Sequence, residues 1–285
     1  PAPILSSPAP TPALIDDPGD IYKALIKDKG DAVVSIKYIL KEQEEESEEE
    51  VQGVVVDESG LILTSNFYMG GFPESLKQIY GRGNRKPLEI KVMISGDQEG
   101  VDATLVARDS ELDLAWLQIT NKDHKKFAAI DISKPAEAQI GDRVLTVERL
   151  TKANDHAHII RESRVRALIT KPRKLAVPGD ELGGSIGMPV FNGKGEYVGV
   201  SSLQFPSKEE MQAEQTSQFA QFRRIPRAMI LPGDDVLKAT NAAREQAKSG
   251  KPVDEEPKTD QAPPGVAKPD APKDDKKDEK KDDKK

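Results

Sequence analysis

Short apolar runs separated by polar turns fill the middle of the chain, and this pattern is typical of β-strands. The runs are rich in Val, Ile and Leu, and Gly, Asp and Asn stand between them. The sequences ESG at 58–60 and NGKGE at 192–196 are typical of hairpin turns. The predicted strands form two sets, at 33–40, 51–57, 61–64, 88–95, 103–107 and 114–120, then at 143–150, 158–162, 165–170, 188–191 and 197–205. Many short strands of this kind predict an all-β barrel or sandwich.

Two helices are expected, one before the strands and one after them. In the first, Asp20 can cap a segment in which Ile21, Leu25 and Ile26 follow helical spacing, and Gly30 ends it. The second, at 234–248, begins with acidic residues and ends on a lysine before a glycine. Acidic residues at the start of a helix and basic ones at its end favour its dipole.

The two ends of the chain differ from the middle. Residues 1–19 are rich in Pro and Ala, and residues 249–285 are rich in Lys, Asp and Pro with almost nothing apolar. Segments with so little apolar surface cannot form a core, so we expect a disordered linker at 1–19 and a disordered tail at 249–285. The single folded domain is then 20–248, which is long enough to bury a sizeable core.

An acidic run, KEQEEESEEE at 41–50, interrupts the strand pattern. Charge runs are usually solvated, so we expect a loop tip between two strands. The alternative is an acidic arm that captures a basic partner or divalent cations.

Composition excludes several functions. The chain of 285 residues carries 42 Lys+Arg against 49 Asp+Glu, a net charge of −7, which argues against binding to a nucleic-acid backbone. It has no cysteine, which excludes disulfides and a cysteine nucleophile, and three histidines, so we expect no metal site and no cofactor. No apolar run approaches 18 residues, so no membrane span is expected.

Six segments in order resemble one family. They are DIYKALIKDKGDAVVSI at 20–36, GVVVDESGLILTSN at 53–66, ARDSELDLAWLQI at 107–119, IGDRVLTV at 140–147, GSIGMPVFNGKGEYVGVSS at 184–202 and RRIPRAMILPGDDVLKATNAA at 223–243. Together they resemble HtrA-like (Deg-type) trypsin-fold serine proteases. The resemblance implies two β-barrels in tandem, at about 31–122 and 138–232, with short terminal helices.

The catalytic residues of that family do not all carry over. The resemblance places Phe67 where the family has its catalytic histidine, Ile186 where it has the serine, and Asp113 where it has the aspartate. Gly184, Ser185 and Ile186 then form the former oxyanion loop. A triad needs a hydroxyl, an imidazole and a carboxylate that orients the imidazole, so only one of its three groups remains. The family fold buries the aspartate position among backbone donors, and we expect Asp113 to stay there as a structural acceptor.

Two features keep an active enzyme open as an alternative. A one-residue shift of register would make Ser185 the nucleophile, although Phe67 would still leave it without a base. The remaining imidazoles that could substitute are His156 and His158, which precede a strand of the second barrel and are otherwise expected in a surface loop.

We therefore expect a catalytically inactive protease homologue that binds a protein or peptide or acts as a scaffold. The alternatives are an active HtrA-type endopeptidase with an unusual catalytic arrangement, and a structural subunit that acts through its charged tails. The resemblance and the first residue, Pro1, favour a chain processed by removal of a signal peptide, in the cell envelope, periplasm or outside the cell. We also expect Phe67, Ile186 and Met188 to pack together and close the old catalytic cleft.

Overall fold

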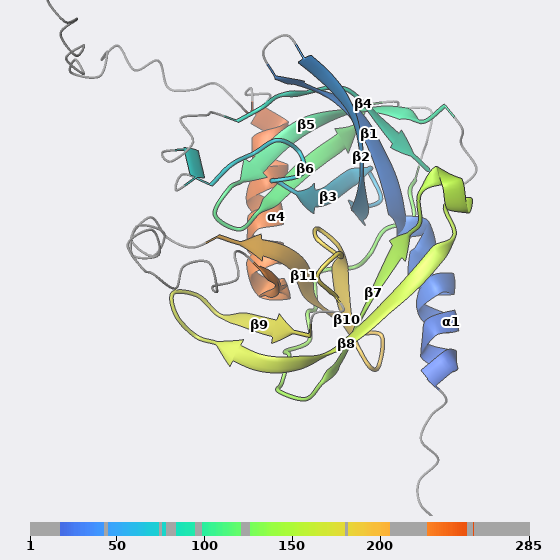
Figure 1. Cartoon of the computed structure of the whole chain (residues 1–285), viewed down its shortest axis with the longest axis vertical. Coiled ribbons are helices and arrows are strands. Elements are labelled where there is room, and N and C mark those ends of the chain that lie inside the picture. Colours follow the sequence, from blue (N-terminus) through green and yellow to red (C-terminus); the bar gives the residue numbers. More distant parts are fainter. Residues whose placement is uncertain are drawn as a thin grey trace, which may run out of the picture. The chain divides into compact units, whose positions relative to one another are not determined.

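Twelve strands form two closed antiparallel barrels of six strands each within the part of the chain described by the structure (Figure 1). The structure is a computed structural model, and it describes residues 18–42, 45–73, 76–77, 84–94, 99–120, 126–179, 182–205, 227–249 and 253. The predicted all-β double barrel is therefore confirmed. The predicted linker, 1–19, and tail, 249–285, fall almost entirely outside the described residues.

The first barrel has the strand order β1-β2-β3-β6-β5-β4. Pairing of β1 with β4 closes it, through Ile36 opposite Val92 and Leu40 opposite Pro87. Its strands are β1 (Val33–Glu42), β2 (Glu45–Asp57), β3 (Leu61–Ser65), β4 (Pro87–Met93), β5 (Val101–Asp109) and β6 (Leu114–Ile119).

The second barrel has the order β10-β11-β12-β9-β8-β7, and β10 pairs with β7 to close it. Its strands are β7 (Arg143–Arg149), β8 (His158–Ile169), β9 (Leu175–Pro178), β10 (Pro189–Asn192), β11 (Tyr197–Gln204) and β12 (Arg227–Pro232). The loop between β9 and β10 reaches the first barrel where Gly187 approaches Ser65, and the end of β7 reaches it where the Arg149 N–H donates to the Gln52 side chain.

Strand alternation divides the apolar side chains among three clusters. Side chains on one face of the first-barrel strands, such as Val34 and Ile62, form one cluster, and Val144 and Val190 belong to a cluster of the second barrel. The opposite faces of both barrels share a third and larger cluster, which contains Trp116, 1% exposed. Because successive strand residues point to opposite faces, one strand can contribute side chains both to the interior of its own barrel and to the cluster between the barrels.

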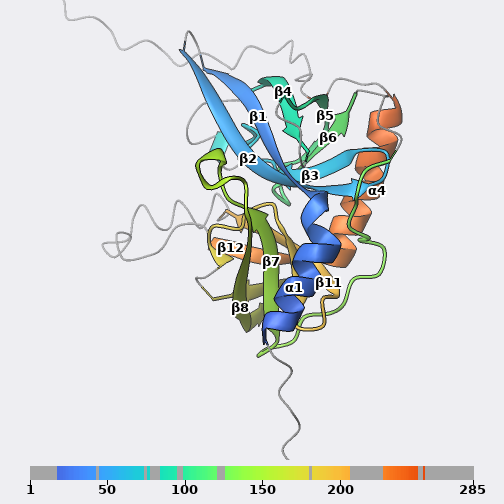
Figure 2. The same cartoon turned by 90° about the vertical axis from the view of Figure 1, so that its right-hand side faces the viewer.

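Both helices join this shared cluster. α1 (Pro18–Lys29) runs into a short 3-10 turn, η1 (Gly30–Ala32), and lies beside β7 and β8 (Figure 2). α4 (Gly233–Ser249) contacts β5 of the first barrel and β11 and β12 of the second. A second 3-10 turn, η2 (Lys152–Asn154), lies between β7 and β8. Neither α-helix in the described part of the chain is long and apolar enough to cross a bilayer.

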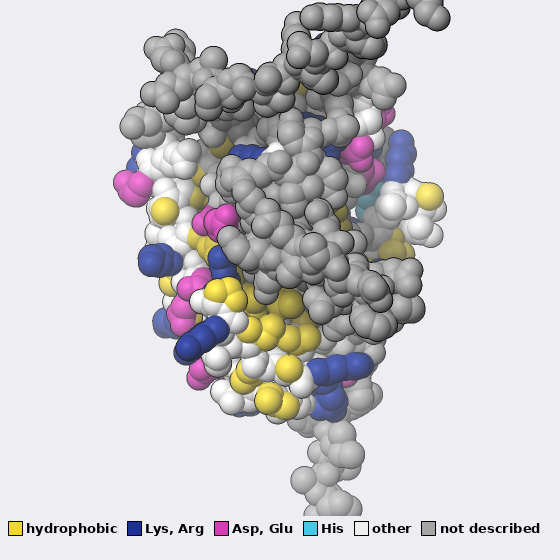
Figure 3. Space-filling model, turned by 60° about the vertical axis from the view of Figure 1, so that its left-hand side comes forward, with side chains coloured by type: hydrophobic (Ala, Val, Ile, Leu, Met, Phe, Trp, Pro, Cys, Tyr) yellow, Lys and Arg dark blue, Asp and Glu magenta, His cyan; other side chains and the backbone are white. Residues whose placement is uncertain are grey.

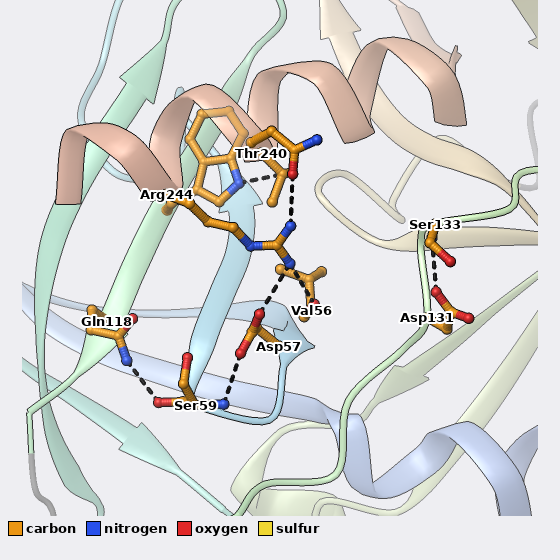
Figure 4. Close-up of polar contacts among 10 residues, drawn as sticks. Val56, Asp57, Ser59, Gln118, Asp131, Ser133, Thr240 and Arg244 are labelled. Carbon is orange, nitrogen blue, oxygen red and sulfur yellow. Dashed lines mark hydrogen bonds and ion pairs between the residues drawn. The ribbon is translucent and has the colours of Figure 1, made fainter. Parts of the chain in front are cut away.

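Polar contacts fix α4 on the first barrel (Figure 4). The Trp116 indole N–H donates to the Thr240 hydroxyl at 3.2 Å, and Arg244 donates to Asp57 at 3.1 Å and to the Val56 carbonyl at 3.4 Å. Trp116 is buried as predicted, and its one polar atom finds a partner on the helix.

The secondary structure differs from the sequence predictions at four places. The acidic run 41–50 is not a loop, because β1 and β2 stay paired as far as Glu42 opposite Glu45. The runs 158–162 and 165–170 form one strand, β8, because its pairing with β7 continues through Ser163 and Arg164. β9, at Leu175–Pro178, was not predicted, since four residues carry little periodicity. The first helix also begins at Pro18, two residues before Asp20.

Candidate functional site

Asp113 lies in the turn just before β6, at the junction of the two barrels, and is 2% exposed. Its carboxylate accepts hydrogen bonds from the backbone N–H of Phe67 at 2.8 Å and of Leu203 at 3.0 Å. The Ser65 hydroxyl lies 2.9 and 3.0 Å from its two oxygens. Phe67 and Ser65 belong to the first barrel and Leu203 to the second, so this one carboxylate ties the barrels together.

Two effects oppose each other at this carboxyl. Burial disfavours its charged form, whereas the donors from Leu203, Phe67 and Ser65 favour it. Burial is the stronger effect and raises the pKa of Asp113 to about 6. Asp113 thus serves as a hydrogen-bond acceptor, although burial makes its ionised form unfavourable.

Phe67 follows β3 directly, in a turn that places its backbone against Asp113. Its ring packs edge-on to Phe72, with centroids 5.8 Å apart, and tilted on Phe205 at 5.4 Å. Tyr68 adds a third ring at 6.3 Å. An aromatic cluster from both barrels therefore occupies the region next to the carboxylate, and Phe67 within it is only partly buried.

The segment 184–188 reaches the same place from the second barrel. Gly187 has φ +82, and a Cβ there would lie 2.8 Å from the Ser65 backbone nitrogen, so only glycine allows this approach. The Gly187 N–H donates to the Ser201 carbonyl at 2.7 Å, and Ile186 and Met188 are buried on either side. Asp113 thus contacts both Ser65 and Phe67, and Gly187, the neighbour of Ile186 in sequence, approaches Ser65 from the second barrel.

Ser185 points elsewhere. Its hydroxyl is 1% exposed, donates to a carboxylate oxygen of Glu148 and lies 3.3 Å from the Thr146 hydroxyl. The other oxygen of Glu148 accepts from Arg161 Nε at 3.0 Å. Thr146 and Glu148 share one face of β7, so strand alternation brings both to the same buried cluster.

The two described histidines have other partners. The His158 ring nitrogen Nε2 lies 3.0 Å from the Gly30 carbonyl, next to the end of α1. Nδ1 of His156 lies 3.9 Å from the Glu50 carboxylate. His156 is therefore near the acidic hairpin, and neither contact leads to Ser185. His124 lies outside the described residues.

A pocket of about 340 Å³ opens between the barrels beside Ile186. Ile186 and Met188 line it on the second-barrel side, Tyr68 on the first, and Arg149 at the end of β7 also faces it. The cleft is therefore not closed at this point, and the predicted packed seam is wrong here. Phe67 does not line this pocket, and its ring packs on Phe72 and Phe205 instead.

A second pocket, of about 500 Å³, lies at one end of the second barrel. Mostly apolar residues between Pro135 and Gly233 line it, including Leu168, which is 40% exposed. Hydrophobic side chains also gather on the lower part of the face in Figure 3. None of the three family positions lines this pocket.

Comparison with known proteins agrees with this architecture. A family model described as a trypsin-like peptidase domain matches residues 51–200, which is more than half of the chain. The chain belongs to the trypsin-like peptidase family. Among curated proteins, none matches the sequence.

Solved structures show the same fold in this trypsin-like domain. A crystal structure of Deg5 superposes with a TM-score of 0.52 at 16% identity and covers 79% of this chain and 94% of its own. A serine endoprotease from Yersinia pestis has a TM-score of 0.50 at 18% identity, with coverage of 81% and 68%. The predicted likeness to HtrA-like, Deg-type proteases is thereby confirmed for the fold.

Sequence reasoning missed several residues of the trypsin-like site. Ser65 and Leu203 were not singled out as donors to Asp113, and Thr146, Glu148 and Arg161 were not expected around Ser185. One signal was available, because Glu148 stands among apolar residues in a predicted strand, where a charge needs a buried partner.

Proposed function

We propose that the chain is a catalytically inactive trypsin-like protease homologue that binds protein or peptide in the cleft between its barrels. The observation that carries this proposal is the contact between Asp113 and Phe67. The carboxylate receives the Phe67 backbone N–H at 2.8 Å, and Phe67 occupies the position that the family resemblance assigns to the catalytic histidine.

A phenyl ring cannot replace an imidazole. It has no lone pair to take a proton from a nucleophile, and it gives Asp113 no side-chain N–H to orient. Ile186, at the position assigned to the serine, has no hydroxyl and is buried at 4% exposure. The machinery for acyl transfer therefore lacks both its nucleophile and its base, while Asp113 serves the fold as an acceptor.

An active endopeptidase with an unusual arrangement is the second candidate. The observation that favours it is the hydrogen bond from the Ser185 hydroxyl to Glu148, because a carboxylate can act as a general base. Against it stand the burial of Ser185, which leaves no access for a carbonyl, and the ion pair of Glu148 with Arg161 at 3.0 Å.

The cleft pocket supports a binding role. It brings an apolar wall, Ile186 and Met188, next to polar groups of both barrels and leaves about 340 Å³ open, a volume typical of small binding sites. We place the protein in the cell envelope, the periplasm or outside the cell, on the family resemblance. A structural role exercised by the charged tails is the third proposal, and nearly all of 1–19 and 249–285 lies outside the described residues.

The deciding experiment is active-site labelling of the full chain with a fluorophosphonate, together with casein turnover. We expect neither labelling nor turnover above background. Labelling that Ser185→Ala abolishes would overturn the proposal in favour of the second candidate. A trypsin-like protease of known activity, treated alongside, controls for the reagent.

A further inference from the structure

Two of the three nitrogens of the Arg149 guanidinium are buried without a hydrogen-bond partner in the part of the chain that the structure describes. Arg149 is 8% exposed, and neither Nε nor Nη2 has a hydrogen-bond partner. No ion pair with this side chain occurs among the described residues. Burial lowers the pKa of Arg149, and the charge of Asp31 opposes that effect only in part. A buried cation with unused donors costs free energy, so its retention calls for a ligand or a structural reason.

The backbone holds this side chain in place. The Arg149 N–H donates to the Gln52 side-chain oxygen at 2.7 Å, across the barrel junction. The Gln52 carbonyl in turn accepts from the Thr64 hydroxyl at 2.7 Å. Leu145 and Val147, on the same face of β7 as Arg149, lie in the apolar cluster that both barrels share. Strand alternation thus aims Arg149 at the inter-barrel junction.

Arg149 also lines the cleft pocket beside Ile186, Met188 and Tyr68. A guanidinium presents a planar set of N–H donors that matches a carboxylate in two parallel hydrogen bonds. Ile186 and Met188 make the surroundings of such a pair less polar, which strengthens it. The pocket therefore has one cationic side chain and an apolar wall around the same 340 Å³, and Nε and Nη2 of that cation are shielded from solvent in the free protein.

We propose that this pocket, the Arg149 pocket, binds a carboxylate of an extended peptide lying in the inter-barrel cleft. The inference rests on the proposed peptide-binding function and names the chemical group that is recognised. The carboxylate belongs to an Asp or Glu side chain or to the peptide C-terminus, and both sources present the same pair of oxygens.

The rim of the pocket favours a peptide over a free small anion. Glu49 and Glu50 of β2 also line the pocket and are exposed. Their charges repel an isolated anion, whereas a peptide gains apolar contact with the exposed ring of Tyr68 that offsets this repulsion.

The first test selects ligands from a synthetic random nonapeptide library, half with free C-termini and half amidated, on the immobilised full chain. Mass spectrometry then reads the enriched peptides. We expect enrichment of a carboxylate at a fixed place, either as Asp or Glu in both halves or as the free C-terminus in one. Enriched peptides without a shared carboxylate would overturn the inference and leave peptide binding standing. A failure to enrich any peptide would contradict both.

The second test measures the enriched peptides on variants. Arg149→Met should weaken binding by about tenfold or more, the loss expected for a charge-assisted hydrogen-bonded pair. Arg149→Lys keeps the positive charge but not the planar pair of N–H donors, so its affinity for the peptides should lie between those of the wild type and Arg149→Met. Arg164→Met removes the same charge from an exposed position of β8 outside the pocket and should change affinity by less than about twofold.

Stability separates a ligand-binding arginine from a structural one. Arg149→Met should raise the melting temperature of the free protein, because it replaces an unpaired buried cation by an apolar side chain. A drop of several degrees would show a structural role and contradict the proposal. Acetate is the probe for free anions, and a melting temperature that rises with acetate but not with the enriched peptides would also contradict it.

Discussion

The carboxylate of Asp113 receives the backbone N–H of Phe67 at 2.8 Å, so the residue at the proposed histidine position is fixed against the carboxylate through its main chain. Because this contact is made by the backbone, any residue at position 67 can make the same hydrogen bond to Asp113. A histidine introduced at 67 would therefore lie next to the carboxylate that orients it.

Restoring catalysis should need two changes. We expect Phe67→His combined with Ile186→Ser to become labelled by a fluorophosphonate, because the pair would supply the missing base and nucleophile beside Asp113. Each single variant should stay at the level of the unmodified protein. Labelling of Ile186→Ser alone would show that another residue already acts as base. Addition of Asp113→Asn to the double variant is the control and should remove the gain.

Asp113 should make stability depend on pH. Its folded pKa of about 6 lies above its ordinary value of 3.8, so its contribution to stability is full below about pH 4 and is lost as pH rises through 6. A shift of this size corresponds to about 3 kcal/mol. Urea unfolding from pH 4 to 7 should show this loss in the wild type but not in Asp113→Asn, which does not titrate.

Carboxyl NMR gives an independent reading of the same group. Ser65→Ala removes a donor to Asp113, so the pKa of that carboxyl should rise further. An unchanged or lower value in Ser65→Ala would contradict the assigned balance between burial and hydrogen bonding.

The ring of Phe67 should contribute to stability although it is partly exposed. Phe67→Ala removes contacts with Phe72 and Phe205, one from each barrel, and should cost about 2–3 kcal/mol in urea unfolding. Phe67→Leu, which keeps apolar volume, should cost about half of that. A nearly neutral Phe67→Ala would mean that the aromatic cluster does not hold the barrels together.

Glu148 should matter more for stability than an exposed glutamate. Glu148→Ala leaves Ser185, Thr146 and Arg161 without their acceptor, and we expect a loss of about 3 kcal/mol or more in the free energy of unfolding. Ser185→Ala should cost about 1–2 kcal/mol. The matched control is Glu245→Ala, which breaks an exposed pair with Lys248 and should change stability by less than about 0.5 kcal/mol.

The sequence could predict the elements that have a strong local pattern. Alternating apolar residues and turn signals placed most strands, and the segment around Asp113 was found because its motif is contiguous. The acidic hairpin escaped because a strand whose residues are all exposed has no apolar alternation to read, and pairing with β1 alone keeps Glu48–Glu50 extended.

Contacts between distant segments could not be predicted from local pattern. Ser185 and Glu148 are 37 residues apart, and Ser65 lies 48 residues from Asp113, so only the closed barrels bring them together. Arg149 looked like any charged residue near the end of a strand. Its burial depends on the first barrel, which no window around position 149 contains.

The shared inter-barrel cluster has a consequence for how the chain reaches its native state. Its members range from Leu25 in α1 to Ala243 in α4, so the layer is complete only when nearly the whole described chain has been made and both barrels have closed. Contacts that span so much sequence carry a high loop-closure entropy and slow the search for the native state. A newly made first barrel therefore exposes one apolar face until the second barrel has folded against it. During this interval the chain is most prone to aggregate and gains most from a chaperone.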